Sequence, residues 1–288
     1  MYAATSPSEP GSATADIIPL HRWADGAAEV SFARSAGETR LKHLYQPAPC
    51  RILFPRQSPG TPKEAVIVTT SGGIVGGDRL RFEIDAEPGS VASVTTQAAE
   101  KVYRSTGAAS EIDVSVRAQD GALLEWVPQE TILFDGARLR RHTRIEVAGT
   151  ARMLAGEIVV FGRRARGESF TKGLLHDAWR LSRDGRLVWA DALNLSADIA
   201  TGIENRHAFD GAAAVATAVY CAPDAADYLD TARHLCRTGG ATCIDNVLVV
   251  RLVHTDAAAL RAEFTHFWKH FRHEAAGLPP VLPRVWDV

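Results

Sequence analysis

The chain has 288 residues, of which 46% are hydrophobic and 23% are charged. These proportions are ordinary for a folded globular protein and exclude a chain that is disordered throughout. The formal net charge of −2 gives no strong positive field, so composition favours neither nucleic acid nor an anionic membrane as a partner.

The first eighteen residues are predicted to form a disordered leader. Residues 1–15 are small and polar, and they lack the basic start and the apolar stretch of a signal peptide. The apolar run at residues 211–222 is far shorter than the roughly 20 residues that a membrane-spanning helix needs. The four cysteines include no C-x-x-C pair, which suits a reducing compartment. We therefore expect a cytoplasmic protein that makes no contact with a membrane.

From about residue 30 to about residue 253, apolar and polar residues mostly alternate, as they do at residues 80–85, 111–116 and 143–147. Side chains of a strand point alternately to opposite faces, so this pattern predicts strands with one buried face and one solvated face. The fold class is therefore mainly β. Nothing in this region has the alternation of strand and helix that a βαβ fold requires.

Turn residues separate the predicted strands. They are Glu-Pro-Gly at residues 87–89 and Asp-Gly at residues 120–121, 135–136 and 184–185. Asp-Gly suits the positive φ angles of tight hairpins. The turns therefore predict that successive strands are antiparallel neighbours, in an antiparallel-rich fold.

A glycine-rich segment at residues 70–80 follows an apolar strand. Gly72 and Gly77 have the spacing of a Walker A loop, which next requires Lys and then Ser or Thr. Asp78 and Arg79 stand there instead, and a carboxylate would repel phosphate. The following residues have a strand pattern, so no helix N-terminus is available to bind an anion. We therefore expect a turn with glycines at positive φ, and no nucleotide.

Two segments near the C-terminus have helical spacing, at residues 224–237 and 256–276. Asp224 can cap the first helix, and Gly277 ends the second. Between them, residues 243–253 read as one well-buried strand. No linker of low complexity divides the chain, so we expect residues 19–288 to form a single domain. The second helix carries one apolar stripe, made of Leu260, Phe264, Phe267, Trp268 and Phe271.

Three histidines of the second helix, His266, His270 and His273, have the spacing i, i+4, i+7 and share a face away from the apolar stripe. H-x-x-x-H is a spacing that can bind metal, but the Glu of the zinc-protease motif is absent. The alternative interpretation is a solvated face beside a buried one, and the sequence leaves both open.

Five blocks in order along the chain resemble the UreD family of urease accessory proteins, called UreH in some organisms. The blocks are SGGIVGGDRL at residues 71–80, TTQAAEKVYRS at 95–105, LEWVPQETILFDGAR at 124–138, GRRARGE at 162–168 and GLPPVLPRVW at 277–286. Any one block is a weak signal, whereas five in order are specific.

The resemblance implies strands coiled into a two-sheet β-helical stack with a small helical part. It also implies a non-catalytic scaffold and metallochaperone for urease maturation. Members of the family bind UreF, which recruits the GTPase UreG, and the assembly docks on the urease apoprotein. Nickel is thought to reach urease through an internal passage, so the resemblance implies transient Ni²⁺ and no permanently bound cofactor.

A passage for nickel should offer ligands that do not retain the ion. Because Ni²⁺ stands high in the Irving–Williams order, a closed site of several imidazoles or thiolates would trap it. The family blocks instead carry carboxylates, and we expect the passage to use Asp78, Glu100, Glu130 and Glu168. For each of these acids taken singly, the alternative is a salt bridge to a neighbouring Arg or an exposed position.

Two other functions remain open. The first is an interaction module that recruits other subunits without handling metal. The second is a β-rich carbohydrate-active enzyme, since such folds carry paired carboxylates. The sequence contains no Ser-His-Asp order, nucleophile elbow or cofactor fingerprint, so we expect no catalytic activity.

Overall fold

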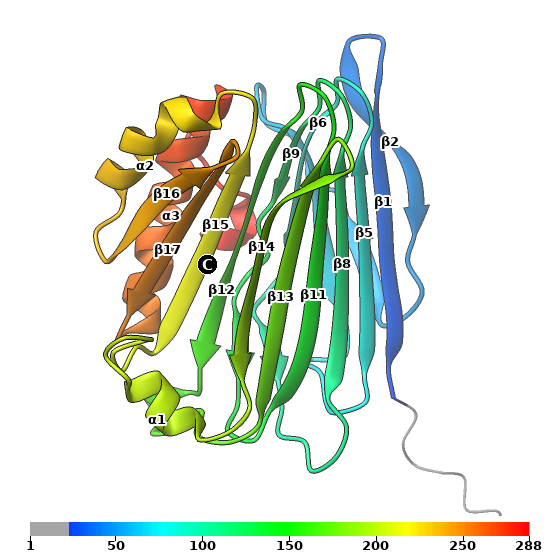
Figure 1. Cartoon of the computed structure of the whole chain (residues 1–288). Helices are drawn as coiled ribbons and strands as arrows, with labels where there is room; N and C mark the ends of the chain where they lie inside the picture. The colour runs from blue at the N-terminus through cyan, green and yellow to red at the C-terminus, as the bar shows by residue number, and fades with distance from the viewer. Residues whose placement is uncertain (1–22, 288) are drawn as a thin grey trace, which may run out of the picture.

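The computed structural model describes residues 23–287, which form two β-sheets stacked face to face (Figure 1). In strand order, the seven-stranded sheet consists of β14 (Arg186–Leu195), β13 (Leu174–Arg183), β11 (Arg138–Val147), β8 (Ser110–Ala118), β5 (Arg79–Ala86), β1 (Asp25–Ser35) and β2 (Glu38–Tyr45). The ten-stranded sheet consists of β16 (Gly239–Ile244), β17 (Val247–His254), β15 (Ala214–Cys221), β12 (Arg152–Phe161), β9 (Leu123–Trp126), β6 (Val91–Thr96), β4 (Lys63–Thr69) and β3 (Cys50–Leu53), with β10 (Thr131–Leu133) beside β12 and β7 (Glu100–Val102) beside β10.

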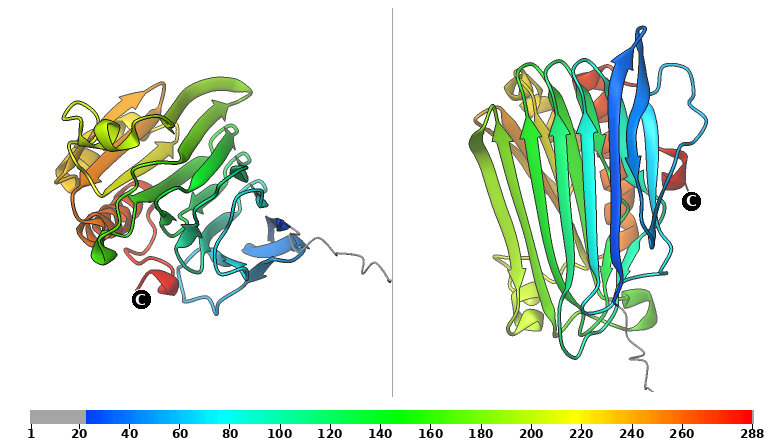
Figure 2. Two further views of the ribbon diagram at one scale, coloured as in Figure 1. Left: turned by 90° about the horizontal axis from the view of Figure 1, so that it is seen from below. Right: turned by 90° about the vertical axis from the view of Figure 1, so that its right-hand side faces the viewer.

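The chain passes alternately from one sheet to the other, so each coil adds one strand to each sheet. β5, β8, β11 and β13 pair in parallel in one sheet, and β4, β6, β9 and β12 pair in parallel in the other. The views in Figure 2 show the resulting two layers. The predicted mainly β fold, coiled into a two-sheet helical stack, is confirmed.

The expectation that strands on either side of the turns are antiparallel neighbours is wrong at three of the four turns. The turns at residues 87–89, 120–121 and 135–136 carry the chain between the sheets, and only the turn at 184–185 closes a hairpin, β13–β14. Their glycines do have positive φ. A tight turn fixes the local backbone, but it does not decide which strand becomes the neighbour. Antiparallel pairs are confined to the two ends of the stack.

The helices are α1 (Ile199–Glu204), α2 (Leu229–Leu235) and α3 (Ala257–Ala276), with 3-10 turns η1 (Arg164–Arg166), η2 (Ala225–Tyr228) and η3 (Arg284–Trp286). The two predicted helices are confirmed as η2 with α2 and as α3, whereas the short α1 was not predicted. Asp256 caps α3 by accepting from the Ala259 N–H at 2.9 Å. Asp224 caps nothing, because its carboxylate pairs with Arg152 at 2.7 Å.

The prediction of one strand over residues 243–253 is wrong, because Asp245 and Asn246 form the turn of a hairpin between β16 and β17. Both turn residues have positive φ, at 49° and 58°. Asn and Asp tolerate that conformation better than other non-glycine residues.

Two hydrophobic cores follow from this layering. The main core lies between the sheets, and a second core lies between the outer face of the ten-stranded sheet and α3 (Figure 1). β15 is buried at every position because Val215 and Val219 face the first core, whereas Ala216 and Ala218 face the second. The aromatic stripe of α3 fills the second core, as its spacing predicts.

The predicted leader, residues 1–18, lies outside the described residues, and the single domain at 19–288 stays a prediction. No helix within residues 23–287 combines the length and the apolar composition needed to cross a bilayer.

Candidate functional site

Three charged side chains meet between the sheets, where apolar residues would otherwise pack. Arg141 of β11, Glu157 of β12 and Asp177 of β13 are exposed by only 6%, 7% and 2%. Arg141 and Asp177 stand at buried positions of alternating strands, and the strand register places them directly opposite each other. Glu157 reaches them from the facing sheet, so the stacking of two sheets assembles the cluster.

The Arg141 guanidinium holds this cluster together. Its Nε donates to Asp177 Oδ1 at 3.0 Å, its Nη1 donates to Thr131 Oγ1 at 2.9 Å, and its Nη2 contacts both Glu157 and Asp177. The Trp179 indole N–H donates to Glu157 Oε1 at 2.9 Å. Buried charges are costly unless they are paired and hydrogen-bonded, and these contacts supply both forms of compensation.

Burial dominates the protonation of the cluster. It raises the pKa of Glu157 to about 8, with the Arg141 charge acting in the opposite direction and the Asp177 charge adding to the rise. Burial alone would lower the pKa of Arg141, but the charges of Asp177 and Glu157 outweigh it and raise this pKa. Arg141 therefore keeps its charge, while burial favours the neutral form of Glu157.

Two small cavities adjoin the cluster. The first has about 30 Å³ of room for water-sized molecules and is lined by Glu100, Thr131, Arg141 and Glu157 among others. The second has about 10 Å³ and is lined by Glu157, Asp177, Asp191 and Arg251 among others. A water molecule needs roughly 10–15 Å³ of such room. The first cavity therefore holds about two waters, and the second holds at most one. Glu157 lines both cavities and is their common wall.

The two cavities and the cluster form a polar file, defined here as Glu100, Thr131, Arg141, Glu157, Asp177, Asp191 and Arg251. At one end Glu100 accepts from Thr69 Oγ1 at 2.8 Å, and burial raises its pKa. At the other end Asp191 pairs with Arg251, whose pKa burial lowers. The side chains of this last pair remain 34% and 40% exposed, so the file reaches solvent there.

Of the four predicted carboxylates, only Glu100 lines one of these cavities. Asp78 is buried and accepts from the backbone N–H groups of Ala24 and Val75 at 2.8 and 2.9 Å, which fastens the glycine-rich turn. Gly72 and Gly77 in that turn have positive φ, as predicted.

The other two carboxylates each pair with an arginine. Glu130 pairs with Arg261 at 2.7 Å, and Glu168 pairs with Arg163 while accepting from the Asp135 N–H at 3.1 Å. These contacts match the salt-bridge alternative. Transient contact of any of the four with nickel stays a prediction.

The three histidines of α3 do not act as one group. The rings of His266 and His270 lie 4.4 Å apart between centroids, and burial followed by the neighbouring His270 lowers the pKa of His266. The His273 Nδ1 is instead 3.0 Å from the Leu278 carbonyl oxygen. Within residues 23–287, no three or more His, Cys, Asp or Glu are grouped to hold a metal ion. Metal binding at this face stays a prediction.

The sequence interpretation missed Arg141, Glu157 and Asp177. A signal was present, because Arg141 and Asp177 are charged residues in the buried phase of alternating strands. Glu157 interrupts an otherwise apolar stretch from Met153 to Phe161. That the three meet could not be read from the sequence, since it depends on which strands face one another.

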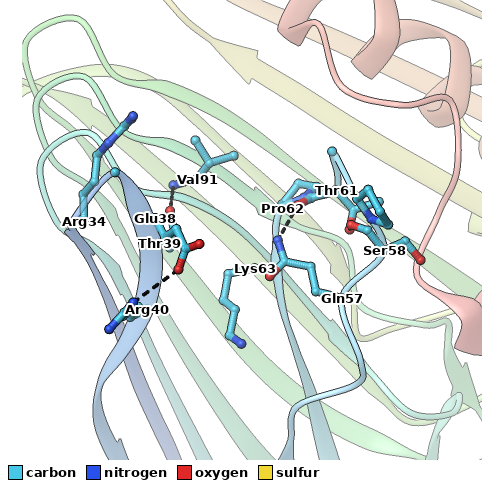
Figure 3. Close-up of a pocket in the computed structure, with 13 residues that line it drawn as sticks. Arg34, Glu38, Thr39, Arg40, Gln57, Ser58, Thr61, Pro62, Lys63 and Val91 are labelled. Atoms are coloured by element: carbon cyan, nitrogen blue, oxygen red, sulfur yellow. Dashed lines mark hydrogen bonds and ion pairs between the residues drawn. The ribbon is translucent and has the colours of Figure 1, made fainter.

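A much larger concavity lies elsewhere, between the tip of the β1–β2 hairpin and the loop before β4, and has about 810 Å³ of room (Figure 3). Its cations are Arg34, Arg40 and Lys63, and Arg40 pairs with Glu38 at 3.3 Å. Among its lining residues there is no aromatic side chain of the kind expected in a sugar-binding groove. No buried polar group converges on it, so we do not place the functional site there.

The fold and its interior define a class of protein: a two-sheet β-helical stack with a polar file between its sheets. Residues 24–287 match the model of the family described as UreD urease accessory protein, and the chain belongs to this family. It is 43% identical over 272 residues to a urease accessory protein UreD of Magnetococcus marinus, covering 91% of this chain and 94% of the relative. It is 41% identical over 286 residues to one of Xanthobacter autotrophicus, covering 98% and 96%. The resemblance noted in the sequence is confirmed.

Proposed function

We propose that this chain, as a urease accessory protein, serves as a non-catalytic cytoplasmic scaffold that carries nickel through its interior to urease. In this proposal it binds UreF, and through UreF the GTPase UreG, and the assembly docks on the urease apoprotein. Family membership supports the role in urease maturation. The observation that supports the metal role is the polar file between the sheets.

The chemistry of the file suits a divalent ion in transit. Glu100, Glu157, Asp177 and Asp191 offer oxygen ligands, and no Cys or His lines the two cavities. Oxygen ligands hold nickel less firmly than imidazole or thiolate sets, so an ion can move on. We propose that the route runs through these four carboxylates, so that only Glu100 is retained from the set that the sequence suggested.

Substitution of Glu157 tests the route, because this side chain lines both cavities. Glu157→Gln keeps an acceptor for Trp179 and leaves no carboxylate at this position to bind nickel. We expect nickel loading of co-expressed urease to fall by roughly tenfold or more, as loss of a group supporting a metal site typically does. Affinity capture of UreF and urease should be unchanged.

The matched control is Glu263→Gln. Glu263 is also a buried carboxylate, accepting from the Arg237 and Thr238 N–H groups at 2.6 and 2.9 Å, but it lies outside the file. This variant should leave nickel loading unaltered. Full loading of urease by Glu157→Gln at equal yield of the complex would rule out the route.

The interaction module without a metal role is the rival function. The observation that favours it is the small size of the two cavities. The six waters around a hydrated ion occupy roughly 180 Å³ of liquid volume, so a fully hydrated ion does not fit in either cavity. Equilibrium dialysis with nickel, on the chain alone and with UreF, separates the two functions. Weak, reversible nickel binding that Glu157→Gln abolishes supports the passage, and urease loading that stays full in Glu157→Gln supports the module.

A further inference from the structure

We propose that Arg141 prevents the Glu157–Asp177 pair from retaining a divalent cation, because its guanidinium occupies the place that a bound metal ion would take. This inference rests on the proposed nickel passage and assigns Arg141 as the residue that separates transit from capture. Arg141 is thus a built-in competitor of the ion, and the file can conduct nickel without storing it.

The oxygen atoms around the guanidinium resemble a ligand set. Asp177 Oδ1 and Thr131 Oγ1 lie 3.0 and 2.9 Å from Arg141 nitrogens, and Arg141 Nη2 also contacts Glu157 Oε2 and Asp177 Oδ2. These oxygens come from both sheets and surround one guanidinium. Carboxylate and hydroxyl oxygens are ligands that a divalent cation accepts. Without Arg141, the converging oxygens would surround an empty site.

The pair requires a cation at this position. The side chains of Glu157 and Asp177 are exposed by 9% and 1%, so water cannot screen their mutual repulsion. A proton, a metal ion or a protein cation must therefore offset their charges. An arginine cannot give up its proton in a protein, whereas a buried lysine can, so Arg141 supplies a charge that persists.

The position of Arg141 along the file matches this role. Arg141 lines the first cavity, Asp177 lines the second, and Glu157 lines both, so the guanidinium stands at the junction. An ion moving from one cavity to the other must displace the guanidinium from a carboxylate. The guanidinium then returns and competes for the same oxygens, which favours release.

A second buried arginine, Arg272, lacks the contact with two carboxylates that Arg141 makes. Arg272 is exposed by 2% and binds Glu125 through Nε at 2.8 Å and Nη2 at 2.6 Å. Its remaining donors go to the carbonyl oxygens of Pro279 and Val281. Here the guanidinium hydrogen-bonds to one carboxylate and to two backbone oxygens, whereas Arg141 contacts two carboxylates at once.

The test is nickel retention by full-length variants, measured after desalting, together with the shift of the melting temperature on adding NiCl₂. Arg141→Met should bind nickel at least about tenfold more tightly than the unchanged chain, with a melting temperature that rises with nickel concentration. Arg141→Met with Glu157→Gln should lose both effects, and Arg272→Met should show neither. Nickel loading of co-expressed urease by Arg141→Met should fall, because the ion is retained.

Arg141→Lys covers the case in which the methionine variant does not fold. A lysine retains a charge but lacks the fork that contacts both carboxylates, so intermediate nickel retention is expected. A folded Arg141→Met or Arg141→Lys chain that binds nickel no more tightly than the unchanged chain overturns the inference. If Arg141→Met retains nickel but Glu157→Gln leaves urease loading intact, the inference holds at this pair and the proposed route fails.

Discussion

At the residue scale, Glu157 is a carboxyl group placed where apolar side chains belong. It is inward-facing on β12, and burial raises its pKa from 4.5 to about 8. Between these two values the folded chain binds more protons at Glu157 than the unfolded chain does. By linkage, the free energy of unfolding must fall as pH rises through this window.

Glu157→Gln should therefore remove part of the pH dependence of stability. The contribution of Glu157 is complete below about pH 4.5 and is lost as pH approaches about 8, with a slope of at most about 1.4 kcal/mol per pH unit. Urea unfolding at several pH values in this range should give a flatter profile for the variant than for the unchanged chain. Parallel profiles would show that Glu157 does not titrate in this window.

At the element scale, the contact of α3 with β12 depends on a position without a side chain. Gly156 faces α3, and a Cβ built there would lie 2.6 Å from Trp268 Cζ3 and 2.9 Å from Phe264 Cζ. The two aromatic rings occupy the space that a methyl group would need. The α3 stripe predicted from the sequence is thus matched by a glycine on the strand beneath it.

Gly156→Ala should destabilise the chain by about 1–3 kcal/mol, because overpacking displaces Trp268 or the helix. Gly202 in α1 is a matched control, since a Cβ there would meet only Leu195 at 3.8 Å. Gly202→Ala should be neutral or stabilise the helix by up to about 1 kcal/mol. Chemical denaturation measures both, and equal stability of the two variants would contradict the tight contact.

At the scale of the whole molecule, the segment before the C-terminus joins α3 to the ten-stranded sheet. The Trp286 indole N–H donates to Thr95 Oγ1 at 3.1 Å, and its ring stacks on Phe264 with centroids 5.9 Å apart. Gln129 donates to the Val285 carbonyl oxygen at 2.8 Å. Residues distant in sequence therefore close the second core.

Trp286→Ala should lower the free energy of unfolding by about 3–5 kcal/mol, the usual result of emptying a large buried aromatic site. Trp23 is a matched control because its side chain is 60% exposed. Trp23→Ala should change stability by about 1 kcal/mol or less. A small effect of Trp286→Ala in urea unfolding would mean that the second core closes without this segment.

The sequence predicted local structure well and the pairing of strands poorly. Alternation in β5, β8 and β11 identified strands, and the spacing of aromatics identified α3, because both patterns record which face of one element is buried. The turns at residues 120–121 and 135–136 have the expected glycine conformation, yet they connect different sheets. Pairing partners are chosen by the coiling of the whole chain, which a turn of two residues does not encode.

By itself, the sequence determined the fold class, the two main helices, the positive-φ glycines of the turn at residues 70–78 and, through five ordered blocks, the family. Only the tertiary structure decided the interior chemistry. Arg141, Glu157 and Asp177 are 16 to 36 positions apart along the chain and come from both sheets. Their meeting depends on parallel register and on the stacking of the sheets. Those are long-range contacts, which local motifs do not encode.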